Sequence, residues 1–113
     1  MVKQIANEGH KAVLDSLLLS LPRVIAGKMF GCPAYYVNGN LFACVYGDGV
    51  GVKVPEELAK SLLSKGQIEP FQPKGKSRMR EWVQINRSRS PDYRLDMDVL
   101  RAAYDYVGTL KNK

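Results

Sequence analysis

Cysteine, histidine and tryptophan are scarce in this sequence, with two, one and one of them in 113 residues. A structural zinc site needs about four Cys or His ligands, and redox cysteine pairs commonly have the CxxC spacing. Cys32 and Cys44 have neither that spacing nor further Cys or His ligands beside them. The scarcity therefore argues against a zinc or dithiol centre, and we expect no metal and no other cofactor.

A long apolar run is also absent. The best candidate, residues 12–21, is interrupted by Asp15 and is not followed by a small-residue cleavage site, which argues against a secretory signal. No uninterrupted stretch approaches the ~20 residues of a membrane span. We therefore expect a cytoplasmic protein without a membrane partner, whose two cysteines are free thiols.

Internal repeats, low-complexity tracts and long linkers are absent too, so residues 1–113 are predicted to form a single domain. The apolar fraction of 45% and the charged fraction of 25% are ordinary for a globular protein and exclude wholesale disorder. The unusual quantity is the net charge of +6.

Helical spacing of apolar residues predicts a first helix over residues 10–21, which Pro22 ends because proline has no backbone donor. Residues 23–30 are predicted to be a connection. Two turn signals then predict a three-stranded antiparallel meander. Asn38-Gly39 favours a type I′ turn, which needs positive φ at both residues, and Asp48-Gly49 repeats the signal. The predicted strands are residues 32–37, 40–46 and 50–54.

If Asn38-Gly39 is a two-residue loop, Val37 faces Asn40 and strict alternation sorts the side chains onto two faces. The first face is expected to carry Tyr35, Val37, Phe42 and Cys44. The second is expected to carry Cys32, Ala34, Tyr36, Leu41, Ala43 and Val45. The two cysteines would then lie on opposite faces. One face packs on helices, and the other is either a second buried surface or a contact surface.

A second helix is predicted to begin at Pro55-Glu56-Glu57, because proline fits the first turn and carboxylates complement the helix dipole, and to end at Gly66. Residues 68–72 form a short strand that Pro70 assigns to a sheet edge. Residues 80–86 form another strand, in which Trp82 is expected to be a core residue.

The last helix is predicted to have Ser90 as its cap and Pro91 at its first position. Its expected apolar stripe is Leu95, Val99, Leu100, Ala103, Tyr104, Val107 and Leu110. The element order is α-β-β-β-α-β-β-α, which predicts a two-layer α+β fold with an antiparallel sheet packed against helices.

The positive charge is concentrated in one stretch, residues 74–89, which we call the basic segment. Residues 1–73 have 7 basic and 6 acidic side chains, and residues 90–113 have 4 of each. The basic segment has one acid, Glu81, and six basic residues: Lys74, Lys76, Arg78, Arg80, Arg87 and Arg89. Such a segment suits phosphate contacts, although a solvated loop would have the same composition. If the strand at 80–86 pairs with 68–72, the two basic groups lie at its opposite ends.

Candidates for catalysis are weak. His10 has no orienting acid or nucleophile beside it in the sequence and is expected at the surface. Cys44 is expected to be a small core residue, whereas partial exposure at a strand start leaves Cys32 as a candidate reactive thiol. The glycine-rich residues 47–51 fit a turn, and the acids Asp92, Asp96 and Asp98 fit a helix start. We therefore expect no enzyme activity.

Several short motifs in a fixed order resemble the TfoX N-terminal domain family. They are Lys28-Met29-Phe30-Gly31, residues 36–43 (YVNGNLFA), residues 50–54 (VGVKV), Glu69-Pro70-Phe71 and residues 79–85 (MREWVQI). The resemblance implies a secretion-chaperone-like fold, shared with the YjbR-like group, and an association with bacterial competence regulation. It brings no catalytic residues, and its matched positions read as structural: Met29, Phe30, Gly31, Asn38, Gly39, Phe42 and Lys53. For Lys53, either a salt bridge or a contact role is open.

The family's founding regulators have a second, helical domain for which this chain has no room, so we expect a stand-alone domain. Our hypothesis is a non-enzymatic bacterial regulatory or binding domain whose basic segment contacts an anionic partner, either nucleic acid, as in transcription regulation by DNA binding, or an acidic protein. The alternative is a protein-interaction module, which includes a homodimer, acting through a sheet face or the edge strand at 68–72.

Overall fold

The computed structural model describes residues 7–29, 31–71 and 80–110. In chain order its elements are α1 (Glu8–Leu18), β1 (Val24–Met29), β2 (Cys32–Val37), β3 (Asn40–Tyr46), β4 (Gly49–Lys53), α2 (Glu56–Leu62), β5 (Ile68–Pro70), β6 (Trp82–Ile85), the 3₁₀ helix η1 (Ser90–Asp96) and α3 (Met97–Gly108). The strands form one antiparallel sheet in the order β1-β2-β3-β4-β6-β5.

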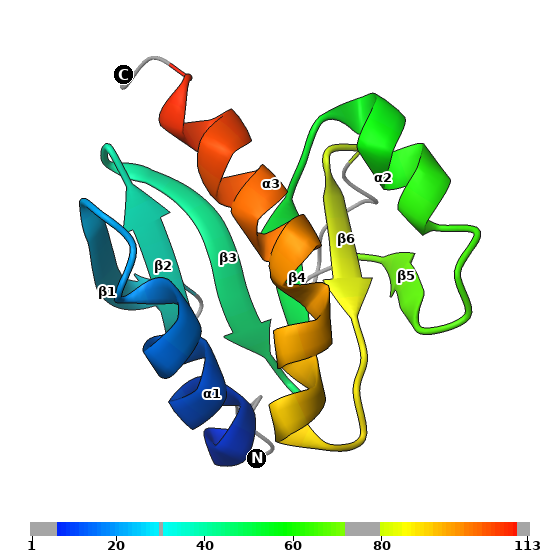
Figure 1. The fold of residues 1–113 in the computed structure, drawn as a ribbon, viewed down its shortest axis with the longest axis horizontal. Helices are drawn as coiled ribbons and strands as arrows, with labels where there is room; N and C mark the ends of the chain where they lie inside the picture. The colour runs from blue at the N-terminus through cyan, green and yellow to red at the C-terminus, as the bar shows by residue number, and fades with distance from the viewer. Residues whose placement is uncertain (1–6, 30, 72–79, 111–113) are drawn as a thin grey trace.

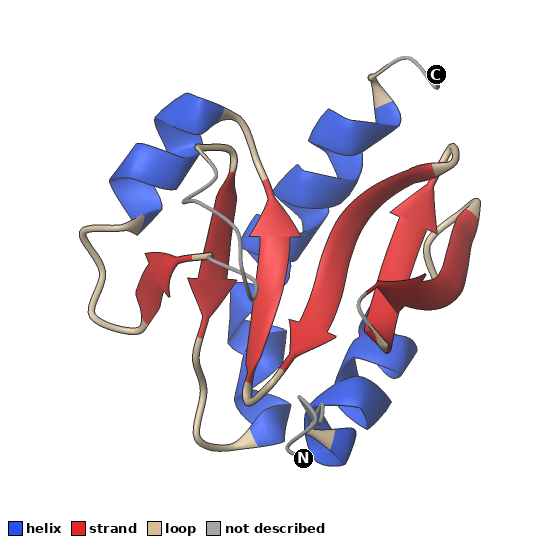
Figure 2. Ribbon diagram, turned by 180° about the vertical axis from the view of Figure 1, so that it is seen from behind, coloured by secondary structure: helices blue, strands red, loops and turns tan. Residues whose placement is uncertain are grey.

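The helices lie on one side of the sheet. Figure 1 shows α1 and α3 crossing in front of the strands, and the reverse view in Figure 2 shows the strands in front of the helices. The main core lies between these layers and includes Leu14, Tyr35, Phe42, Leu100 and Val107, all 0–1% exposed. The predicted two-layer α+β fold is confirmed.

The Asn38-Gly39 hairpin forms as expected. Val37 pairs with Asn40, and Asn38 and Gly39 have φ of 53° and 80°, the combination that a type I′ turn requires. The amide of Asn38 also donates to the Gly108 carbonyl at the end of α3, 2.9 Å away. The turn therefore fixes both the register of β2 and β3 and the position of the last helix.

A β-bulge in β3 overturns part of the predicted face assignment. Tyr36 pairs with Leu41 but Tyr35 pairs with Ala43, so Phe42 is an extra residue on the β3 side. From Ala43 onward, each side chain of β3 lies on the face opposite to the one predicted. Ala43 and Val45 therefore lie in the main core with Tyr35, Val37 and Phe42, whereas Cys44 lies on the other face.

The bulge also brings the two cysteines onto one face, contrary to the prediction. Ala34 pairs directly with Cys44, and Cys32 shares the face of Ala34 because it is two residues away. Both thiols are free and 0% exposed. The predicted core role of Cys44 is confirmed, and the partial exposure suggested for Cys32 is wrong.

The helix-free face has its own small apolar cluster. Phe71 is fully buried there, with its ring 5.6 Å from Tyr46 and 5.3 Å from Trp82. A side chain on Gly51 would meet the Phe71 ring at 2.8 Å, so this ring lies directly against the bare backbone of β4. Trp82 is half-buried at the rim of this cluster instead of lying in the main core.

Residues 24–29 form β1, an edge strand where the sequence suggested only a connection. Arg23, with φ of 64°, turns the chain after α1, and Gly31, with φ of 78°, belongs to the two-residue link to β2. The predicted element order is otherwise the order observed. β5 is the other edge strand and pairs with β6, as Pro70 and the hairpin argument predicted.

The first helix begins and ends earlier than expected, and its histidine is buried. Asn7 caps α1 by accepting from the His10 backbone N–H at 3.0 Å. His10 is 1% exposed, contrary to the prediction of a surface residue. Its Nδ1 lies 2.7 Å from Ser90 Oγ and its Nε2 lies 3.2 Å from the Asp48 carbonyl oxygen. The ring therefore joins α1 to the β3–β4 turn and to η1.

The start of the last helix also differs. Ser90 is not the cap: it begins η1, and its hydroxyl contacts His10. Because η1 is a 3₁₀ helix of three residues per turn, Leu95 leaves the predicted apolar stripe and is 74% exposed. Leu100, Ala103 and Val107 of α3 are buried as expected. Among the described residues, no helix is long and apolar enough to cross a membrane.

Candidate nucleic-acid interface

The basic segment begins after β5 and passes through β6. Lys74, Lys76 and Arg78 lie outside the described residues, so the structure places Arg80, Arg87 and Arg89. Phe71 and Trp82 flank residues 72–81, and their ring centroids are 5.3 Å apart. Phe71 and Trp82 therefore lie close together on the helix-free side of the sheet.

Arg80 lies exposed at the point where β6 begins. It lines a hollow of about 270 Å³ with Glu56, Ala59 and Lys60 of α2, and an adjoining one of about 420 Å³ with Lys53 and Glu81.

The two acids that line these hollows have partners of their own. Glu81 lies 3.8 Å from Lys53 and Glu56 lies 3.9 Å from Lys60. The Tyr106 hydroxyl donates to Glu81 at 2.6 Å, and this hydrogen bond raises the pKa of Tyr106. Within the described residues Arg80 has no ion-pair partner.

Arg87 lies at the other end of β6 and is held inside the fold. Its guanidinium donates from Nε to Asp96 Oδ2 at 3.0 Å and from Nη2 to Oδ1 at 2.8 Å, a bidentate pair. The two side chains are only 17% and 9% exposed. The hydrogen bond to Asp96 raises the pKa of Arg87 above its usual value. Arg89, two residues further on, is exposed.

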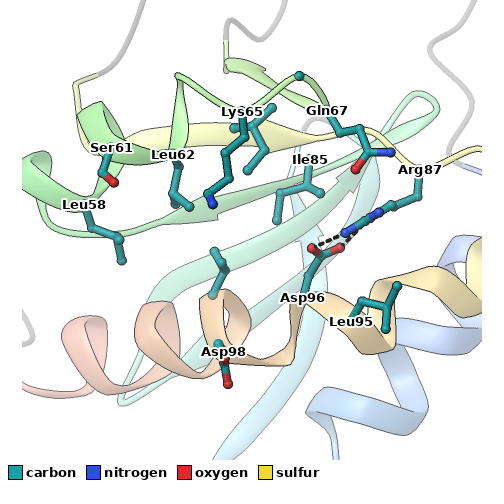
Figure 3. A pocket seen from close by; sticks show the side chains of 13 residues that line it. Leu58, Ser61, Leu62, Lys65, Gln67, Ile85, Arg87, Leu95, Asp96 and Asp98 are labelled. Atoms are coloured by element: carbon teal, nitrogen blue, oxygen red, sulfur yellow. Dashed lines mark hydrogen bonds and ion pairs between the residues drawn. The ribbon is translucent and has the colours of Figure 1, made fainter.

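The Arg87–Asp96 pair forms one wall of a cleft of about 640 Å³ between α2, the β5–β6 pair and η1 (Figure 3). Leu58, Leu62, Ile85 and Val99 supply its apolar surface. In Figure 3 the Asp96 carboxylate points toward Arg87, whereas the Asp98 carboxylate points away from the pair. The guanidinium of Arg87 therefore has a structural role, because its pair with Asp96 links the end of β6 to η1.

The sequence did not predict that two lysines, Lys53 and Lys60, lie near Arg80. Lys53 of β4 lies near Arg80 because the sheet order places β4 beside β6, and Lys60 lies near it because α2 packs on β6. The sequence signal that could have found Lys60 is its i,i+4 spacing from Glu56, which indicates an exposed helix face.

The remaining motif residues have packing roles where the structure describes them. Phe42 is buried against the Tyr104 ring, with centroids 5.9 Å apart, and Met29 packs partly buried on the helix-free cluster. Gly31 uses its freedom of φ, and Lys53 pairs with Glu81. Phe30 lies outside the described residues. Across the described ranges, no group of three or more His, Cys, Asp or Glu could hold a metal ion.

The two thiols should resist alkylation in the native protein. Burial raises the pKa of Cys44 to about 12, and Cys32 is 0% exposed, so a reagent in solution reaches neither sulfur in the folded protein. We expect iodoacetamide to modify both cysteines quickly in denaturant and very slowly without it, as followed by intact mass. Fast native labelling of Cys32 would contradict this burial and would revive a reactive-thiol role.

Comparison with known families and structures identifies the family of this chain and a protein of similar fold. The family model for the TfoX N-terminal domain matches residues 16–106, and the chain therefore belongs to that family, as its motifs predicted. The crystal structure of the Deinococcus radiodurans protein DR2400, with family-model domain DUF419, is similar with a TM-score of 0.69. It shares 18% identity, covers 88% of this chain and is itself covered over 79%, a likeness of fold. No curated protein matches.

Proposed function

We propose that this TfoX N-terminal domain is a binding domain that contacts nucleic acid through its basic segment. Family membership supports a regulatory or binding role in general terms. The observation that carries the finer proposal is the concentration of charge: five of the six excess positive charges fall in residues 74–89.

The local contacts favour an outward-facing positive surface. Glu81, the one acid of the segment, is already engaged by Lys53 and Tyr106, and Glu56 is engaged by Lys60. Arg80 is left exposed beside the three basic residues that precede it in the sequence. The contact between Phe71 and Trp82 brings the residues on either side of that stretch close together. Closely spaced cations of this kind bind phosphates and release counterions.

The test is the affinity for a duplex oligonucleotide, measured by fluorescence anisotropy over a series of salt concentrations. Each lost phosphate contact lowers the slope of log affinity against log salt by about 0.9. Replacing Lys74, Lys76, Arg78 and Arg80 by glutamine should therefore weaken binding and flatten the slope by about 3–4.

A matched control removes the same charge elsewhere. Lys28, Lys65, Arg94 and Arg101 are exposed residues outside the segment, and their replacement by glutamine should leave the slope nearly unchanged. Equal losses in the two quadruple variants, or no binding by the wild type at low salt, would contradict the proposal.

A second candidate is protein interaction through the helix-free face of the sheet. The observation that favours it is the half-buried ring of Tyr36 and the neighbouring Leu41, which lie at the rim of the Phe71 cluster without a helix above them. Pull-down with Tyr36→Ser as the variant tests it, and capture of the same proteins by both forms would contradict it.

A further inference from the structure

β1 is an open sheet edge that no described element covers. The four central residues of β1 are exposed although their side chains alternate between the two faces. Ile25 is 67% exposed, an unusual state for a large apolar side chain on a strand. An open edge of this length is a template for pairing with another strand.

The register shows which backbone groups face the open side. Val37 closes the Asn38-Gly39 turn and bonds to β3, so the residues of β2 before it, back to Cys32, face β1 and β3 in alternation. Cys32 faces β1 and exchanges hydrogen bonds with Met29. Alternate residues, Gly27 and Ile25, likewise bond to β2. The N–H and C=O groups of Val24, Ala26 and Lys28 therefore point away from the sheet.

Two of these six outward groups already have partners. The Val24 N–H donates to the Leu21 carbonyl at 3.4 Å, and the Lys28 carbonyl accepts from the Tyr36 hydroxyl at 3.1 Å. Four groups have no partner within the described residues: the Val24 carbonyl, both groups of Ala26 and the Lys28 N–H.

We propose that β1 pairs antiparallel with β1 of a second copy of this chain, with Ala26 opposite Ala26. In that register the two Ala26 residues exchange both of their hydrogen bonds. Each Lys28 N–H donates to the Val24 carbonyl of the other copy. All four open groups are thereby used. In this ladder the Val24 N–H of one copy faces the Lys28 carbonyl of the other. These are the two outward groups that already have partners within their own chain.

Neighbouring registers fit less well. A pair centred on Gly27 would place Ala26 opposite Lys28, so that the Ala26 N–H would face the Lys28 carbonyl, which already accepts from the Tyr36 hydroxyl. A pair centred on Ile25 would place Val24 opposite Ala26 and leave the Lys28 N–H without one. The pattern of bonded and open groups therefore selects the register as well as the partner.

The side chains are complementary in the same register. On the helix-free face, Ile25 lies opposite Gly27 of the second copy, where the absence of a side chain leaves room. A Cβ on Gly27 would meet the Tyr36 ring at 2.9 Å, so this ring already lies over that glycine. Ile25 of one copy would pack against Tyr36 of the other. Lys28 lies opposite Val24, so no like charges face each other.

The mass in solution tests the dimer without any nucleic acid, so its failure is separate from that of the proposed function. We expect sedimentation equilibrium to give twice the chain mass at high concentration. Ala26→Pro removes an outward N–H that the monomer does not use, and it should yield a folded monomer. Circular dichroism verifies that it is folded.

Cysteine cross-linking tests the register and covers the case in which Ala26→Pro fails to fold. Directly opposite Ala26 residues have Cα atoms about 5.5 Å apart, within disulfide range. Ala26→Cys should therefore form a covalent dimer under mild oxidation. In Lys28→Cys, the control, the two positions are offset by four residues, roughly 13 Å along the strand, and should not cross-link. A wild type that stays monomeric, or equal cross-linking at both positions, would overturn the proposal.

Discussion

Replacing Phe71 with alanine is expected to lower the free energy of unfolding by about 3–5 kcal/mol. Phe71 is fully buried on the helix-free face, between the Tyr46 and Trp82 rings. The phenyl ring lies against the backbone of Gly51, which has no side chain that could move into the space left by the ring. The variant would therefore keep a cavity and lose two aromatic contacts. Urea unfolding followed by circular dichroism measures the change.

Phe71→Leu is the matched control, because leucine keeps most of the apolar volume. We expect this variant to lose about 1–2 kcal/mol, well below the alanine variant. A loss under about 1 kcal/mol for Phe71→Ala would mean that the ring is not packed as described.

Replacing Asp96 with alanine is the second large effect, with an expected loss of about 2–4 kcal/mol. The Arg87 guanidinium makes two short hydrogen bonds to the Asp96 carboxylate and is only 17% exposed. Removing the carboxylate leaves this cation partly buried without its partner. Since Arg87 follows β6 and Asp96 ends η1, the connection between sheet and helix should loosen. Hydrogen exchange at Arg87 and Tyr93 would increase together with the loss of stability.

Asp98→Ala is the control for the Asp96 variant. It removes the same charge from the wall of the same cleft, but its carboxylate points away from Arg87 (Figure 3). Asp98 lies in the first turn of α3, so only its favourable interaction with the helix dipole is lost, about 0.3–1 kcal/mol. Similar losses in the two variants would show that the bidentate pair contributes little.

Local sequence signals predicted much of the fold because their physics is local. Asn38-Gly39 specifies a turn through its positive φ values, and Pro70 marks an edge strand through its missing donor. The two-layer α+β class followed from the order of such elements. The β-bulge at Phe42 could not be predicted in this way. It leaves the turn unchanged and becomes visible only when both strands are paired.

Longer-range contacts explain the other differences. His10 is buried because Ser90 and Asp48, which are 80 and 38 residues away in the sequence, supply its hydrogen bonds. Leu95 is exposed because η1 has three residues per turn, so a stripe calculated for an α-helix is out of phase there. β1 was missed because Gly27 and Lys28 disfavour strands, whereas pairing with β2 and the ring of Tyr36 compensate.

The candidate site was predictable in position but not in detail. Counting charges by segment located the basic segment, and Arg80 is exposed. Composition alone could not distinguish Arg87, which is bound by Asp96, from its neighbour Arg89. Composition also could not show that Lys60 belongs to the candidate site, because Lys60 lies near Arg80 only through the packing of α2 on β6. Such distinctions depend on which acid lies opposite which base in the folded chain.

Chemical-shift mapping tests the central claim most directly. A duplex oligonucleotide is titrated into ¹⁵N-labelled protein at low salt, and the amide shifts of the whole chain are followed. We expect the largest shifts at residues 74–82 and at Arg89, with little change in α1 and β1, and their reversal at high salt. Shifts that are absent, or that concentrate on α1 or on β1, would contradict binding through the basic segment.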